Sequence, residues 1–109
     1  MNGEDIRIGY VTAPSPEVAE LLARTLVLER LAGCANLLPG MKSIYTWEGR
    51  IEEAAEVVLI VKTTVARWPE LERRIRELHP YRTPCILGLD AAAAGEAFAR
   101  WIAESTRET

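Results

Sequence analysis

The fold is decided by the stretch KSIYTWEGRIEEAAEVVLIVKTT, which is residues 42–64. Residues 44–47 are good strand formers, and Glu48-Gly49 is typical of a tight hairpin turn, so we expect the segments on either side to pair as antiparallel strands. Fifteen extended residues, 50–64, would reach about 50 Å, whereas a globule of this chain length is only about 34 Å across. Either residues 52–56 form a bulge or a break, or the hairpin projects and packs on another subunit.

The returning strand contains the uninterrupted apolar run Val57–Val61. A strand with one solvated face alternates apolar and polar residues, so this run indicates that both faces of the sheet are covered. One chain of this size has enough helix to cover one face. We therefore expect self-association to cover the other.

The flanking sequence supplies the remaining elements. Ser15 is a good helix N-cap followed by Pro16, Gly33 is a candidate helix C-cap, and His79-Pro80 is a helix stop. The predicted elements are a strand over 6–12, a helix from 16, a short strand over 34–38 closed by Pro39-Gly40, the hairpin, a helix over 65–78, a strand over 85–89, and a terminal helix after Gly95. This β-α-β-β-α-β-α order predicts an α+β fold, a ferredoxin-like βαββαβ unit plus a C-terminal helix.

Length and composition narrow the class of protein. The chain has 109 residues, 49% of them hydrophobic and 27% charged, which indicates one globular domain over residues 1–109. Thirteen Lys and Arg against 16 Asp and Glu give a net charge of −3, which argues against nucleic-acid binding. No apolar run approaches the roughly 20 residues that span a membrane. Two cysteines and no secretory signal predict a cytoplasmic protein.

Metal binding is the chemical theme with candidate residues. No nucleotide-binding loop and no GxSxG, HExxH or paired CxxC motif occurs, so we expect a protein that is not an enzyme. Cys34, Cys85 and the single histidine, His79, are the donor types that Cu(I) and Zn²⁺ prefer. Each has a structural alternative, because free cysteines are commonly buried and a histidine can cap a helix C-terminus.

Three further residues are candidates for a pocket between subunits. Lys62 interrupts an apolar strand and could face an anion, although a charge there also suits a strand end. Trp47 and Tyr81 could contact a ligand or simply pack in a core or turn. The acidic residues near the hairpin tip could bind hard divalent ions, or could be a solvated surface that resists edge pairing; they are Glu48, Glu52, Glu53 and Glu56.

Several motifs, in order along the chain, resemble the CutA divalent-cation tolerance proteins. These motifs are TAP at 12–14, LAGCANLLPG at 31–40, SIYTWEGRIE at 43–52, KTT at 62–64 and HPYRTP at 79–84. The resemblance implies a tight homotrimer, with the hairpin in contacts between subunits, and an association with divalent cations, copper above all. Cys34 falls on a cysteine of that family. Cys85, however, stands where most members carry Glu, and Val11 where some bacterial members carry Cys.

The resulting hypothesis is a cytoplasmic homotrimer of metal-ion homeostasis. It would need no obligatory cofactor and would bind Cu²⁺ or another divalent cation at subunit contacts, through Cys34, His79 and Cys85. The alternative is a trimeric sensor of the PII type, binding a small anion in a cleft between subunits lined by Trp47, Lys62 and Tyr81.

Overall fold

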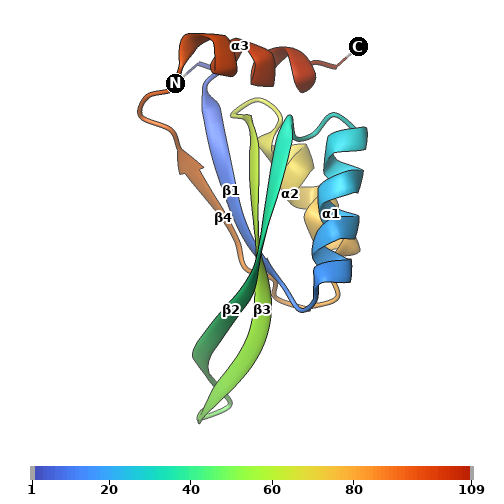
Figure 1. Cartoon of the computed structure of the whole chain (residues 1–109), viewed down its shortest axis with the longest axis vertical. Helices are drawn as coiled ribbons and strands as arrows, with labels where there is room; N and C mark the ends of the chain where they lie inside the picture. Colours follow the sequence, from blue (N-terminus) through green and yellow to red (C-terminus); the bar gives the residue numbers. More distant parts are fainter. Residues whose placement is uncertain (1, 109) are drawn as a thin grey trace.

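Residues 2–108, which the computed structural model describes, form a four-stranded antiparallel sheet and three helices (Figure 1). The elements are β1 (Ile6–Ala13), α1 (Pro16–Leu28), β2 (Cys34–Trp47), β3 (Arg50–Thr64), α2 (Trp68–Leu78), β4 (Ile86–Asp90) and α3 (Glu96–Ser105). The strands lie in the order β2-β3-β1-β4, so β2 and β4 are the two edges of the sheet. This confirms the predicted α+β, ferredoxin-like βαββαβ fold with a C-terminal helix.

The long hairpin of β2 and β3 projects from the body of the molecule (Figure 1). Its two-residue turn has Glu48 at φ 51° and Gly49 at φ 79°, and positive φ at both positions matches the twist of the flanking strands. Strand β3 runs without a break from Arg50 to Thr64, and the molecule measures 44 × 26 × 22 Å. Of the two alternatives that the strand length left open, projection is correct.

The irregularity lies in β2 rather than in β3. Residues 34–38 do not form a separate short strand, as Pro39-Gly40 predicted, because β2 continues to Trp47 with a register shift between Leu38 and Met41. Proline is tolerated here because β2 is an edge strand, where a missing N–H need not cost a ladder hydrogen bond. Gly40 adopts φ 86°, which lets the strand pass through the bulge.

Two predicted helix ends are wrong, and their local chemistry explains why. Helix α1 starts as expected, with the Ser15 hydroxyl accepting from the Val18 N–H at 3.2 Å, but it ends at Leu28 rather than at Gly33. Arg30, at φ 62°, makes the turn that glycine was expected to make. Helix α2 begins at Trp68 rather than at residue 65. The residue after Trp68 is a proline, and a helix tolerates proline only in its first turn, so the helix cannot start a full turn earlier.

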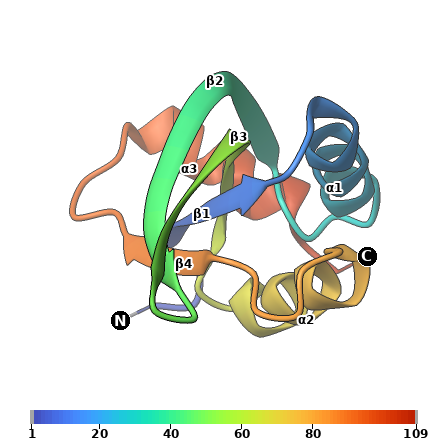
Figure 2. The same cartoon turned by 90° about the horizontal axis from the view of Figure 1, so that it is seen from below.

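Helices α1 and α2 cover one face of the sheet, and the opposite face is largely open (Figure 2). The core between them contains the side chains of Val11, Leu22, Leu26, Leu59, Val61, Leu71 and Ile75. On the opposite face, which we call the open face, Leu38, Leu87 and Leu89 are each more than half exposed. Helix α3 lies across one end of the sheet (Figure 1). The fold thus leaves an apolar sheet surface that one chain does not cover.

Candidate functional site

Several predicted site residues meet where the hairpin leaves the body of the sheet. His79, Tyr81 and Cys85 belong to the loop between α2 and β4, and this loop lies against Thr12 of β1 and Glu56 of β3. We call these five residues the hairpin-base cluster. Thr12 and Glu56 are not neighbours of the loop in sequence, and only the pairing of the strands brings them to it.

His79 holds the loop in place. Its Nδ1 accepts the backbone N–H of Tyr81 at 3.1 Å, so Nε2 carries the proton that is donated to the Thr12 carbonyl at 2.7 Å. The side chain is buried and its ring lies 4.8 Å from the Tyr81 ring. Both ring nitrogens therefore have protein partners, and a metal ion could bind Nδ1 only by replacing the Tyr81 N–H.

Glu56 and Tyr81 form a partly buried acceptor and donor pair, in which Glu56 is buried and Tyr81 is 38% exposed. The Tyr81 hydroxyl donates to Glu56 Oε2 at 3.2 Å, and Glu56 is only 8% exposed. Burial raises the pKa of Tyr81, and the negative charge of Glu56 raises it further. The phenol consequently stays protonated at neutral pH and keeps donating to the carboxylate.

Cys85 contributes a half-buried free thiol to the same cluster. The pKa of this thiol is raised above its ordinary value, chiefly by burial. A hydrogen bond with Thr12 lowers the pKa in part, and the negative charge of Glu56 raises it. The thiol is thus protonated at neutral pH. A metal ion that binds this thiol must displace its proton, and the Glu56 carboxylate of the same cluster is also of a chemical type that binds metals.

Cys34 lies far from this cluster. Cys34 pairs in register with Lys62. The Lys62 ammonium donates to Asn36 Oδ1 at 2.5 Å, and the Cys34 thiol lies 3.9 Å from the same oxygen. Cys34 is on the edge strand β2, whereas Cys85 precedes the opposite edge strand β4. One chain therefore does not bring Cys34 to Cys85, and within residues 2–108 no group of three or more His, Cys, Asp or Glu side chains is arranged to hold a metal ion.

The three residues predicted for a pocket are also separated within one chain. Trp47 lies at the tip of the hairpin opposite Arg50 and is 57% exposed. Lys62 lies near the other end of β3, and Tyr81 lies in the hairpin-base cluster. Any pocket that contains all three needs more than one chain.

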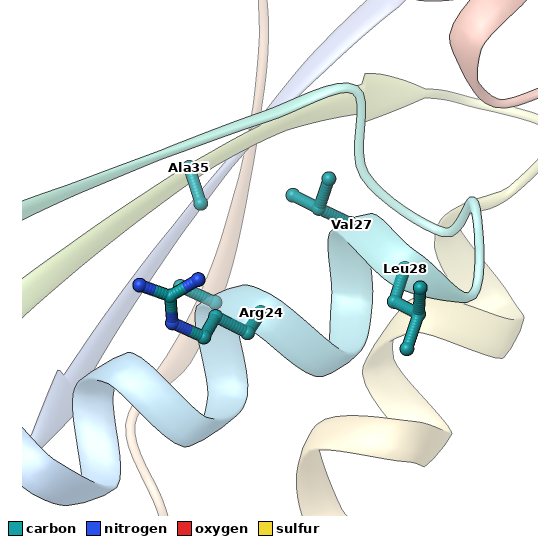
Figure 3. Close-up of a pocket in the computed structure, with 5 residues that line it drawn as sticks. Arg24, Val27, Leu28 and Ala35 are labelled. Atoms are coloured by element: carbon teal, nitrogen blue, oxygen red, sulfur yellow. The ribbon is translucent and has the colours of Figure 1, made fainter.

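A groove of about 510 Å³ runs between helix α1 and the edge strand β2 (Figure 3). Its walls come from α1 and from Ala35, and Arg24 and Val27 reach from the helix toward the strand. The Arg24 guanidinium is paired with Glu20 at 2.8 Å. None of the predicted site residues lines this groove, so it adds no donor to the hairpin-base cluster.

No helix within residues 2–108 is both long and apolar enough to cross a bilayer.

Comparison with known proteins identifies the family. The model of the family described as CutA1 divalent ion tolerance protein matches residues 7–105. The divalent-cation tolerance protein CutA of Thermus thermophilus is 45% identical over 96 residues, covering 88% of this chain and 93% of the relative. The solved structure of the divalent cation tolerance protein from Thermus thermophilus superposes with a TM-score of 0.91 at 42% identity, covering 94% of this chain and 99% of the other. That of the periplasmic divalent cation tolerance protein CutA from Archaeoglobus fulgidus also gives 0.91, at 38% identity, covering 94% and 99%. The chain therefore belongs to the CutA1 divalent ion tolerance family.

Proposed function

We propose that this protein contributes to divalent-cation tolerance by binding Cu²⁺ or another divalent cation as a homotrimer. The observation that carries the metal-binding part is that the Cys85 thiol and the Glu56 carboxylate belong to one half-buried cluster, in which the charge of Glu56 acts on the thiol. A thiolate and a carboxylate are both metal donors, and the thiolate favours soft or borderline ions. Hard ions such as Mg²⁺ fit this pair less well.

The remaining donors join the site by two routes. His79 binds through Nδ1 once the Tyr81 N–H gives up that nitrogen, and until then it positions the loop that carries Cys85. Cys34 lies at the opposite edge of the sheet from Cys85, so it reaches a Cys85 only across a contact between chains. The proposed site therefore depends on the proposed assembly.

The assembly is supported by what the single chain leaves uncovered. Its two sheet edges, β2 and β4, are different surfaces, and a contact between one edge and the other is heterologous, which closes into a ring when the rotation allows. The apolar residues of the open face and the projecting hairpin offer further surface for such a ring. The Val57–Val61 run is consistent with this, because Val58 and Ile60 point to the open face.

A serine at position 85 is expected to weaken Cu²⁺ binding by about tenfold or more, because the hydroxyl replaces a metal-binding thiolate. The raised pKa of Cys85 adds a second readout. Below that pKa binding releases the thiol proton, so native affinity should rise with pH, and the Cys85→Ser variant should show a shallower rise. Competition titrations against a copper chelator, without oxygen, between about pH 6 and pH 8.5 measure both quantities.

The companion variant is Cys34→Ser, which removes the other free thiol. We expect it to weaken copper binding while leaving the mass of the assembly unchanged. Equal copper affinity and equal pH dependence in native protein and in both variants would contradict the proposed ligands.

The proposal has two further parts, the kind of role and the location. The role is not enzymatic, and the location is the cytoplasm, where thiols such as Cys34 and Cys85 stay reduced; cell fractionation tests the location. The PII-type alternative, a cleft between subunits lined by Trp47, Lys62 and Tyr81, is less favoured, because the matching family and the similar relatives are described as divalent-cation tolerance proteins.

A further inference from the structure

Three arginines from separate segments of the chain meet at a cavity far from the hairpin-base cluster. Arg30 lies in the turn after α1, Arg67 immediately precedes α2, and Arg107 follows α3. The cavity has a volume of about 360 Å³, and its walls also include Glu29, Glu70 and Glu108. Arg67 is close to the end of β3 that is opposite the hairpin, so this cavity and the hairpin-base cluster lie at different ends of the sheet.

The cavity wall contains equal numbers of arginine and glutamate residues, yet its positive charge is not fully balanced. Glu29 is bound by Arg74 through two hydrogen bonds of 2.9 and 3.0 Å, so its charge is already neutralised. Arg30 donates to backbone carbonyls, those of Arg107 at 2.9 Å and Glu104 at 2.8 Å. Its positive charge is therefore not balanced by a carboxylate in these hydrogen bonds.

Arg67 is the most buried of the three and is incompletely satisfied. Its side chain is 11% exposed, and its Nη1 donates to Glu70 at 3.1 Å and to Glu108 at 2.8 Å. The contact of Nη2 with the Arg30 carbonyl is long, at 3.5 Å, and buried Nε has no acceptor among the described residues. Arg67 is also the N-cap of α2 and provides no side-chain cap, so the positive end of the helix dipole adds to its charge.

We propose that this cavity, formed by Arg30, Arg67 and Arg107, is a binding site for a phosphate group. Phosphate carries close to two negative charges and several acceptor oxygens, which suits converging guanidinium groups. The Arg107 side chain makes no hydrogen bond within residues 2–108 that would hold it away from such a ligand.

Glu108 acts as an internal competitor for this site. Its carboxylate contacts Arg67 Nη1 at 2.8 Å, while its side chain is 74% exposed. The carboxylate half of this pair is largely in water, so an external anion can compete with it for Arg67. Removing the charge of Glu108 frees part of the Arg67 guanidinium and also removes a repulsive charge from the cavity.

The test is a titration with inorganic phosphate, in which binding is measured by calorimetry and by thermal unfolding. A metal chelator is present, and NaCl holds the ionic strength constant. Glu108→Gln is expected to bind phosphate about two- to fivefold more tightly than native protein. Arg107→Gln is expected to lose about tenfold in affinity, because a charge-assisted contact is lost. The matched control is Arg100→Gln, an arginine of α3 that pairs with Glu96 and does not line the cavity.

The control should bind phosphate like the native protein. Equal affinity in native protein, Glu108→Gln and Arg107→Gln would overturn the proposal. So would an effect of phosphate that NaCl of the same ionic strength reproduces, because that would be screening rather than binding.

Discussion

Replacing Leu59 with alanine is expected to lower the free energy of unfolding by about 2–5 kcal/mol. Leu59 is fully buried in the middle of β3, where it packs between the sheet and helices α1 and α2. It pairs with Val11 on one side and with Leu37 on the other, so neither neighbouring strand can shift to fill the space. Urea unfolding at one fixed protomer concentration measures the change, because the stability of an oligomer depends on concentration.

The control for this substitution is Leu28→Ala, the same chemical change at a side chain that is 84% exposed. Its effect should stay within about 0.5 kcal/mol, because little apolar area leaves water there on folding. Similar losses of stability at both positions would contradict the assignment of the core to the layer between the helices and the sheet.

Replacing both Leu87 and Leu89 with aspartate is expected to convert the proposed trimer into monomers. In the single chain these side chains are 56% and 52% exposed, so aspartate there faces water and the fold survives. In an assembly that covers the open face, the same two carboxylates would be buried without partners. Such burial costs several kcal/mol per charge, which is more than a contact of this kind can tolerate. Analytical ultracentrifugation would report a threefold fall in mass.

The matched control places one aspartate on the helical side of the molecule. Leu28→Asp introduces one such charge at a more exposed leucine, and it should leave the mass unchanged. A double variant of Leu87 and Leu89 that keeps the native mass would show that the open face is not the surface between the chains.

Local sequence signals predicted the fold well wherever the determining chemistry is local. The turn at Glu48-Gly49 needs positive φ at both positions, and Ser15 caps α1 through a hydroxyl three residues from its partner. Pro39-Gly40 misled the prediction of a strand end for the opposite reason. Whether proline interrupts a strand depends on which strands flank it, and this is a property of the whole sheet.

The sequence predicted the kinds of donor in the site, but not which donors meet. Cys85 was identified as a chain-specific thiol, whereas its partners Thr12 and Glu56 are far away along the chain and become neighbours only through strand pairing. Glu56 was grouped with the exposed acids of the hairpin. Its position directly before the apolar run Val57–Val61 is the signal that could have marked it as buried.

Native mass spectrometry is the sharpest test of a copper-binding trimer, because it reports the number of chains and the bound metal together. Protein treated with a chelator is measured first, and then again after Cu²⁺ is added at one equivalent per chain, for the native chain and for Cys85→Ser. We expect three chains in each case, with discrete bound copper in the native protein and less in the variant. A monomer, or a trimer that retains no copper, would show that the protein is not a copper-binding trimer.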